Sequence, residues 1–405
     1  MSKAIVIIGT LDTKGPEVAY LRKCIEAKGH PVLVLDPGVL GQAAIQADIT
    51  REEVARAAGV SLADLVAAGD KGRAIGTMIA GTRAIIARLY GAGRIAGVLA
   101  VGGGQGTAIG TSAMQVLPVG TPKLMLSTVV SGRSVFEPYV GTTDMTLMHS
   151  VADIVGVNVI TRKVFQNAAG AIVGMVEGGT AGEPGTRTVI GATMLGLTTP
   201  CVLRARELLE EYGYEVVTFH ANGTGGRCME RLVDEGVIRG VLDLSTQELT
   251  GHVCNGLFDG GPQRMVSAGR RGLPQVVAPG GTDYIVLGPL DSLSEEHRRR
   301  PLLIHNPNIT LVRTSGQEMA QVGSLMARRL NESRGATTVL IPMRGLSYSN
   351  RPGHVLYDPE ADRALFTALR AELHPGIEIQ EIDAHINDPG FAKVAAERMH
   401  ARMAA

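Results

Sequence analysis

The feature that most constrains the fold of this chain is a repeat within it. Shifted by 184 positions, IVIIGTLDTKGPEVAYLRKCIEAKGHPVLVLD (5–36) aligns without a gap on VIGATMLGLTTPCVLRARELLEEYGYEVVTFH (189–220). Each copy has the pattern of an apolar strand, a polar loop, an amphipathic helix and a second apolar strand. A pair of such βαβ units predicts two similar α/β domains.

Two further segment pairs follow in the same order. RIAGVLAVGGGQGT (94–107) resembles IRGVLDLSTQELT (238–250), and GTPKLMLST (120–128) resembles GLPQVVAPGGTD (272–283). In each segment an apolar run ends at small or polar residues. Three matches in the same order indicate an internal duplication.

Short apolar runs alternate with longer helical patterns, which is typical of parallel sheets covered by helices on both faces. We therefore predict an α/β fold of two tandem Rossmann-like, doubly wound domains with mainly parallel sheets and an interdomain cleft. The Gly- and Pro-rich stretch around 179–187 predicts a linker between domains at 1–178 and 188–405. Thr50 with Glu53, and Ser315 with Glu318, fit capping boxes at helix starts.

Composition excludes several classes of protein. Lys+Arg and Asp+Glu balance at 39 each, and aromatic residues make up 3% with no Trp, which disfavours nucleic-acid binding. The four cysteines form no CxxC pair and show no metal-ligand spacing, so we expect free thiols. Neither a signal peptide nor a membrane-spanning run is present, and a cytoplasmic protein is expected.

In doubly wound sheets ligands bind beyond the carboxyl ends of the strands. In the first domain GTLDTKG (9–15) follows the first strand, but it is neither a Walker A loop nor a GxGxxG fingerprint. VGGGQGT (101–107) lets backbone approach a phosphate or ribose closely, and LMLSTVVSGRS (124–134) is a third donor-rich strand end. The predicted cofactor-binding residues are Gly9, Thr10, Asp12, Lys14, Asp36, Gly102, Gly103, Gly104, Gln105, Gly106, Thr107, Ser127, Thr128 and Gly132.

The roles of three charged residues have alternatives. Asp12 and Lys14 lie beside a helix start, where anions bind, yet Asp12 would equally cap the turn while Lys14 faces water. Asp36 ends the second strand, where an acid holds a ribose hydroxyl. Further along, Asp144 is expected to begin a helix, and the spacing of Met145 and Met148 predicts buried positions on it.

In the second domain polar residues follow the predicted strands. His220, Asp283, His305 and Arg344 are the catalytic candidates, because they would supply acid/base and anion-binding chemistry. The candidate substrate-binding residues are Asn222, Gly280, Gly281, Thr282, Asn306 and Ser347. The sequence contains no GxSxG, HExxH or HxH motif, and it does not identify the metal ligands. Cys201 lies at a helix start, but Glu17 occupies its place in the other repeat, which disfavours a nucleophilic role.

Seven motifs occur in order along nearly the whole chain: IGTLDTKGPE, AVGGGQGT, PYVGTTDMT, APGGTD, HNPNITLVRTS, IPMRGLS and HINDPGFA. By these motifs the chain resembles the bacterial members of the Tm-one-like ATP-binding family, which is related to the tomato mosaic virus resistance protein. The resemblance implies two Rossmann-like subdomains, ATP binding in the N-terminal one, and a homodimer or higher homo-oligomer. It also implies a TIM-barrel companion, fused in plants and expected here as a separate partner. It implies no established reaction.

Together these observations predict an ATP-dependent enzyme that activates or phosphorylates a small anionic metabolite in the interdomain cleft. GTLDTKG and VGGGQGT would hold ATP, with Lys14 near phosphate and Mg²⁺ on Asp12 or Asp144. The alternative is a nucleotide-sensing or assembly subunit without chemistry of its own. An NAD-type oxidoreductase, which rests mainly on Asp36, and a sugar transferase with two facing Rossmann domains also stay open.

Overall fold

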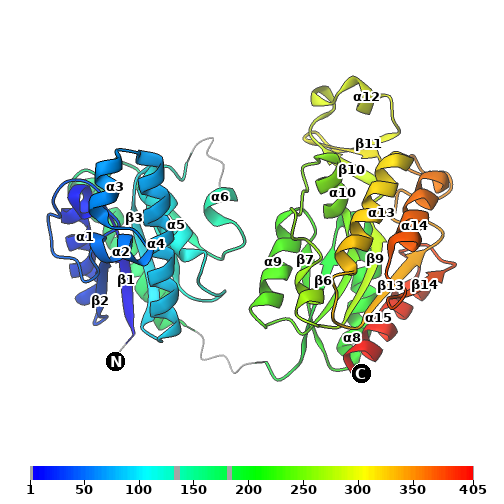
Figure 1. Ribbon diagram of the computed structural model, residues 1–405, viewed down its shortest axis with the longest axis horizontal. Coiled ribbons are helices and arrows are strands. Elements are labelled where there is room, and N and C mark those ends of the chain that lie inside the picture. Colours follow the sequence, from blue (N-terminus) through cyan, green and yellow to red (C-terminus); the bar gives the residue numbers. More distant parts are fainter. Residues whose placement is uncertain (1–2, 132–136, 180–184, 405) are drawn as a thin grey trace. The chain divides into compact units, whose positions relative to one another are not determined.

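The computed structural model describes residues 3–131, 137–179 and 185–404. The chain forms two compact units, Met1–Glu183 (unit 1) and Pro184–Ala405 (unit 2), coloured blue to cyan and green to red in Figure 1. The boundary falls within the segment 179–187.

Unit 1 contains a five-stranded parallel sheet in the order β2-β1-β3-β4-β5. Its strands are β1 (Ala4–Ile8), β2 (Val32–Leu35), β3 (Ile95–Gly102), β4 (Lys123–Ser127) and β5 (Thr146–His149). The central strands are apolar throughout because both of their faces are buried.

Seven helices of unit 1 lie in the described residues: α1 (Leu11–Glu26), α2 (Arg51–Ala57), α3 (Leu62–Ala68), α4 (Lys71–Gly91), α5 (Gly104–Met114), α6 (Glu137–Val140) and α7 (Val159–Glu177). One apolar core lies between the sheet and α1 and α7, and a second lies between the sheet and α2 to α5. The predicted capping box at Thr50 and Glu53 begins α2. Inside α1, Lys14 leaves helical geometry (φ −125°, ψ 16°), so Pro16 stands near the start of the regular helix.

Unit 2 contains a six-stranded parallel sheet in the order β14-β13-β9-β8-β6-β7. Its strands are β6 (Val189–Met194), β7 (Glu215–His220), β8 (Gly240–Ser245), β9 (Gln275–Gly280), β13 (Thr337–Pro342) and β14 (Glu378–Ile382). The first five strands in chain order have the same spatial order as those of unit 1, as a duplicated unit should. The predicted α/β fold of two domains with parallel sheets is therefore confirmed.

The helical segments of unit 2 cover both faces of this sheet. In chain order they are η1 (Gly196–Thr198), α8 (Thr199–Glu211), α9 (Thr224–Asp234), α10 (Gln247–Cys254), α11 (Ser267–Arg270), η2 (Leu290–Ser292), α12 (Glu295–Arg298), α13 (Gly316–Leu330), α14 (Pro359–Glu372) and α15 (Pro389–Ala404). One core packs under α8 and α15, and another under α13 and α14. The predicted capping box at Ser315 and Glu318 begins α13.

Unit 2 also contains a three-stranded antiparallel sheet that the sequence analysis did not predict. It consists of β10 (Tyr284–Leu287), β11 (Leu302–Asn306) and β12 (Ile309–Arg313), with β12 in the centre. Figure 1 shows these strands and α12 extending beyond one end of the six-stranded sheet. The segment 302–313 is thus a hairpin, and His305 and Asn306 do not follow a strand of the parallel sheet.

The prediction that a helix begins at Asp144 is wrong. Residues 146–149 form β5, which pairs with β4 and is the edge strand of the sheet in the described part of the chain. The Asp144 carboxylate accepts hydrogen bonds from the Lys123 ammonium (2.7 Å) and from the backbone N–H of Gly120 (2.8 Å). Helical spacing over a few apolar residues does not distinguish a short edge strand from a helix.

Candidate functional site

A pocket of ≈ 370 Å³ opens at the carboxyl edge of the unit 1 sheet, and we call it the unit 1 pocket. Its walls come from segments that follow β1, β2 and β3 and from α3 and α4. Its polar lining residues are Thr10, Asp12, Thr13, Asp70, Lys71 and Gln105, and its apolar ones include Leu40, Leu65, Val66, Ala74, Ile75, Met78 and Ile109. The pocket therefore combines an apolar wall with charged and hydroxyl groups.

Three helices begin beside the unit 1 pocket: α1 after Thr10, α4 after Asp70 and α5 after Gly103. Thr10 and Gly103 make no side-chain capping bond, whereas the Asp70 carboxylate accepts from the N–H of Arg73 (3.0 Å). First-turn N–H groups have no acceptor inside a helix, and the helix dipole makes this end positive. The start of α5 thus offers backbone donors to an anion. At the start of α1 the N–H of Leu11 already donates to the Asp36 carboxylate (3.1 Å), and the N–H groups of Thr13 and Lys14 donate to the Thr10 carbonyl.

The glycines of the loop before α5 fall into two classes. A Cβ atom at Gly102 would stand 2.8 Å from the Cα of Gly106, so glycine is required there for close packing. At Gly104 a Cβ would meet no described atom within 4 Å, and at Gly103 only the Thr128 hydroxyl, at 3.7 Å. Within the described residues nothing requires glycine at positions 103 and 104. These two positions leave open space beside the helix start, as close approach of a ligand to the backbone needs.

The lysine that reaches the unit 1 pocket is not the predicted one. The Lys14 ammonium donates to the backbone carbonyl of Ile154, in the segment before α7, and Lys14 is not among the residues that line the pocket. Lys71, the first residue of α4, lines it instead. No motif marks Lys71 or Asp70 in the sequence, so neither residue was predicted, although an Asp before a helix is typical of an N-cap.

Asp36 is buried and its carboxylate is fully used within unit 1. One oxygen pairs with the Arg51 guanidinium (2.6 and 2.9 Å), and the other accepts the N–H groups of Leu11 (3.1 Å) and Gly38 (2.8 Å). Arg51 also donates to the carbonyl of Leu40 (2.8 Å), so the pair shapes the loop that forms one wall of the pocket. Asp36 therefore acts on the pocket by positioning this loop.

The remaining predicted cofactor residues have supporting positions. The hydroxyls of Thr107 and Ser127 lie 2.6 Å apart in a buried contact that ties α5 to β4. Gly9 is buried, and a Cβ there would stand 2.7 Å from a valine side chain of α1. Thr128 is half-buried at the end of β4. Gly132 lies outside the described residues.

In unit 2 the structure brings two of the four catalytic candidates to one pocket. His220, at the end of β7, and His305, on β11, both line a pocket of ≈ 170 Å³, which we call the unit 2 pocket. Arg344 is not among its lining residues; its guanidinium pairs with the Asp383 carboxylate (2.6 and 2.7 Å), and both side chains are exposed.

The fourth candidate, Asp283, is fully buried. Its carboxylate accepts a hydrogen bond from the Ser347 hydroxyl (2.7 Å). Burial raises the pKa of Asp283 to about 7; the negative charge of Asp362 adds to this rise and Arg313 opposes it. The predicted substrate residues Gly280, Gly281, Thr282 and Ser347 are buried beside it, and the structure places none of them in the unit 2 pocket.

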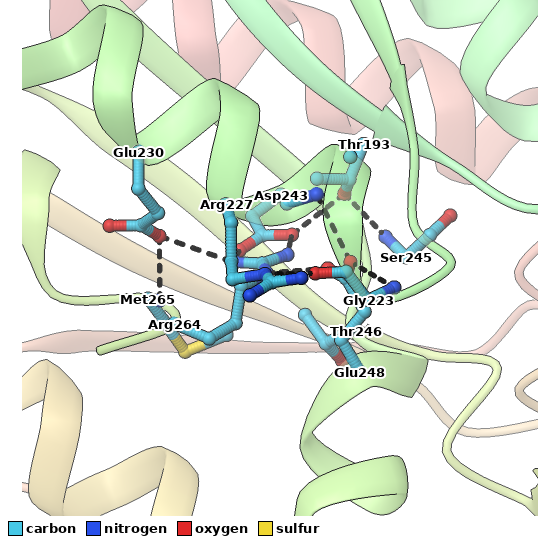
Figure 2. Close-up of polar contacts among 12 residues, drawn as sticks. Thr193, Gly223, Arg227, Glu230, Asp243, Ser245, Thr246, Glu248, Arg264 and Met265 are labelled. Carbon is cyan, nitrogen blue, oxygen red and sulfur yellow. Dashed lines mark hydrogen bonds and ion pairs between the residues drawn. The ribbon is translucent and has the colours of Figure 1, made fainter. Parts of the chain in front are cut away.

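The glycine-rich loop before α9 (219–227) is filled by the protein itself. The Glu248 carboxylate, on α10, accepts the N–H groups of Gly223 (2.7 Å) and Gly226 (3.0 Å). Figure 2 shows Glu248 and Gly223 within the same group of polar contacts. A Cβ at Gly226 would stand 2.0 Å from this carboxylate, and one at Gly225 would stand 1.9 Å from the carbonyl oxygen of His220. Internal packing thus requires these glycines, and Glu248 takes the place that a bound anion would have.

Arg264 lies at the centre of this buried cluster. Its guanidinium contacts Glu248 (2.6 Å), Asp243 (2.6 and 2.7 Å) and Glu230 (3.4 Å), and its side chain is fully buried (Figure 2). Thr193 donates to Asp243 (2.7 Å). Burial raises the pKa of Glu230, against the opposing effect of Arg264. The cluster neutralises charges that would be costly to bury alone.

The two candidate asparagines each bind a nearby backbone N–H group, and Cys201 is buried. The Asn222 side chain accepts from the N–H of Gly225 (3.3 Å), and Asn306 accepts from the N–H of Asn308 (2.9 Å) in the hairpin turn. Burial raises the pKa of the Cys201 thiol to about 12, which agrees with its rejection as a nucleophile.

Two further features bear on ligands and environment. Asp12 and Asp70 both line the unit 1 pocket, and Mg²⁺ in nucleotide sites is held by one or two carboxylates together with phosphate oxygens. Among the described residues no group of three or more His, Cys, Asp or Glu is placed to hold a metal ion by itself. No helix in the described parts of the chain is both long enough and apolar enough to span a membrane.

Comparison with known proteins gives consistent matches over the whole length. Residues 3–181 match the N-terminal domain, and 187–403 the C-terminal domain, of a family described as uncharacterised protein family UPF0261. A UPF0261 protein of Clostridium tetani is 42% identical over 400 residues (98% of both chains), and one of Rhizobium meliloti is 38% identical over 395 residues (97% of both).

The ToMV susceptible protein tm-1(GCR26) of Solanum lycopersicum is 32% identical over 418 residues, which cover 98% of this chain and 55% of the tomato protein. The crystal structure of a putative UDP-N-acetylglucosamine 2-epimerase from Listeria monocytogenes aligns with 68% of this chain and 79% of its own, at 11% identity and a TM-score of 0.24. That structural likeness carries no conclusion about this chain. The two domain matches and the relatives above 30% identity show that this chain belongs to the UPF0261 family.

Proposed function

We propose that the unit 1 pocket binds ATP together with Mg²⁺, and that the protein uses the nucleotide in an ATP-dependent reaction on a small anionic metabolite. One observation carries the proposal. Asp12 near the start of α1, Gln105 near the start of α5 and Lys71 at the start of α4 all line one pocket that also has an apolar wall. Gly103 and Gly104, where packing does not require glycine, directly precede Gln105.

Each part of this arrangement matches a part of ATP. The apolar wall from Leu65 to Met78 offers a surface for the base, as ligand pockets commonly do. The Lys71 ammonium and the N–H groups at the start of α5 suit the phosphates. Asp12 and Asp70 would hold Mg²⁺, which neutralises phosphate charge in phosphoryl transfer.

Thermal unfolding in the presence of ligands tests the binding. We expect MgATP to raise the melting temperature, since a ligand at 100-fold its Kd stabilises by about 2.7 kcal/mol. ADP, NAD and UDP-glucose are the comparison ligands. No shift with MgATP, or a shift with NAD or UDP-glucose alone, would contradict the assignment of ATP.

Two lysine substitutions test where the phosphates of the nucleotide bind. Lys71→Ala should weaken MgATP binding by roughly tenfold or more, because it removes a charge-assisted contact of about 1.5–3 kcal/mol. Lys28→Ala is the matched control, since Lys28 is exposed just after the end of α1 and does not line the pocket. Equal affinities of the two variants would exclude the proposed phosphate position.

A measurement of ATP turnover distinguishes an enzyme from a nucleotide-sensing subunit. Radiolabelled ATP is incubated with the protein and pools of small carboxylates and phosphates. Release of ADP or AMP that depends on one pool supports the enzyme. Tight binding without release in any pool would leave the binding site intact and refute the reaction.

A further inference from the structure

We propose that the unit 2 pocket is a second ligand site, which binds a small carboxylate with an aromatic or branched apolar body. The inference concerns unit 2 alone and does not depend on nucleotide binding in unit 1. It rests on the volume and lining of this pocket, on its two histidines and on the buried cluster that holds the loop after His220.

The pocket has an apolar interior of suitable size. Leu195, Phe258, Val286, Ile309 and Leu311 line it, together with the ring of the buried Tyr284. Its volume of ≈ 170 Å³ is close to the ~150 Å³ of an apolar cavity that admits benzene. A six-membered ring or a branched chain of similar size would fill it.

Among the described residues that line it, the ionisable side chains are those of Tyr284, His220 and His305, and both histidines are exposed. Imidazole N–H groups donate hydrogen bonds, and a protonated imidazole adds a positive charge. No carboxylate side chain lines this pocket in the described residues. An anionic head group therefore meets two donors and no like charge, whereas a cation would find no acidic partner.

Contacts within unit 2 fix the chain that follows His220. The loop that follows it begins α9, and Glu248 binds the N–H groups of Gly223 and Gly226 in that loop. Arg264 in turn holds Glu248 in place (Figure 2). His305 comes from a different element, the hairpin of β11 and β12, so the pocket joins the parallel sheet to the antiparallel one. Groups fixed in this way bind a ligand without a large ordering cost.

Three small molecules test whether the pocket needs the ring, the charge or both. Benzoate has both the ring and the carboxylate, benzyl alcohol keeps the ring without charge, and acetate keeps the charge without the ring. The full-length protein, labelled with ¹⁵N in its histidine side chains, is titrated with each probe and followed by NMR. We expect benzoate to shift the His220 and His305 resonances saturably, with a Kd of roughly 0.1–10 mM for a ligand of about nine heavy atoms.

Variants assign the effect to the pocket. His220→Ala and His305→Ala should each weaken benzoate binding by about fivefold or more, because each removes one imidazole donor to a charged group. His374→Ala is the matched control: His374 is exposed in unit 2 and is not among the lining residues. Both pocket histidines are exposed, so these changes should leave folding intact, which the unfolding curve of each variant checks.

Three results would overturn the proposal: no saturable shift of either histidine with benzoate, equal binding of acetate or benzyl alcohol, or equal affinity of all three variants. The first result alone decides against the site in the unmodified protein. Loss of MgATP binding leaves this proposal standing, because the two readouts come from different units.

Discussion

At the scale of single residues, glycine has two different uses in similar loops. Gly103 and Gly104 in unit 1 face open space, whereas Gly225 and Gly226 in unit 2 are packed against other atoms of the chain. The sequence shows both loops as glycine-rich strand ends. Only the first leaves room for a ligand.

A pair of glycine substitutions tests this distinction. Gly104→Ala should leave the free energy of unfolding nearly unchanged, because its Cβ would meet no described atom within 4 Å. It should weaken MgATP binding, because the added methyl group would stand where the proposed phosphates approach the backbone. Gly102→Ala should cost about 1–3 kcal/mol of stability, since its Cβ would stand 2.8 Å from Gly106. Urea unfolding and calorimetric titration measure the two effects. A stability loss in Gly104→Ala as large as that in Gly102→Ala would contradict the prediction.

Asp283 gives a residue-scale prediction about pH. Its pKa in the folded protein is about 7, above the ordinary 3.8, chiefly because of burial. Between these values the folded protein holds a proton that the unfolded chain has lost, so stability falls as the pH rises. Relative to Asp283→Asn, the wild-type protein should lose up to about 4 kcal/mol between about pH 4 and pH 7.

Urea unfolding of both proteins across this pH range measures the difference, which cancels the titration of all shared groups. If the wild-type protein does not lose stability relative to Asp283→Asn as the pH rises from 4 to 7, Asp283 is already ionised in the folded protein at pH 4, and the prediction is wrong.

At the scale of elements, the buried cluster around Arg264 connects α9, α10 and β8. Glu248 caps the start of α9 from α10, and Asp243 lies near the end of β8. The cluster contains one guanidinium among three carboxylates, two of which are nearly inaccessible. Its role is to fix the loop between β7 and α9.

Removing one partner of a buried ion pair leaves the other uncompensated. Arg264→Leu should therefore cost roughly 3–5 kcal/mol, because Asp243 and Glu248 stay buried without a cation. Glu248→Gln should cost less, since its amide oxygen still accepts the N–H groups of the loop. As a control, Arg204→Ala breaks an exposed pair with Glu207 and should change stability by less than about 1 kcal/mol. Equal losses in Arg264→Leu and Arg204→Ala would refute the role of the cluster.

At the scale of the whole molecule, the chain contains two units with separate cores. The apolar clusters of unit 1 use residues of unit 1 alone, and those of unit 2 use residues of unit 2 alone. The strand order is shared, but unit 2 has gained an antiparallel sheet and a filled glycine loop. The two copies have diverged most at the loops beyond their strands.

Separate cores predict separate folding. Fragments 1–183 and 184–405 should each give cooperative urea unfolding and the circular dichroism of an α/β protein. The first fragment alone should keep the affinity of the full chain for MgATP. A fragment 1–183 that is folded yet binds MgATP much more weakly would show that the unit 1 pocket is incomplete without unit 2.

The sequence by itself determined the fold class, the duplication and the starts of the two helices that have capping boxes, α2 and α13. These depend on local patterns: apolar period, glycine at strand ends, and capping pairs such as Thr50 with Glu53 and Ser315 with Glu318. The hairpin of β11 and β12 also had a local signal, the Asn306–Pro307–Asn308 turn between two apolar runs, which the sequence analysis did not use.

Only the tertiary structure decided which side chains reach a pocket. Lys14 binds a carbonyl 140 positions away, and Asp36 is held by Arg51 and by an N–H 25 positions away. Lys71 and the pair His220 and His305 have no shared motif, yet packing brings each to a pocket wall. A local pattern determines whether a segment forms a helix or a strand. The partner of a polar side chain depends instead on elements distant in sequence, which only the packed fold brings together.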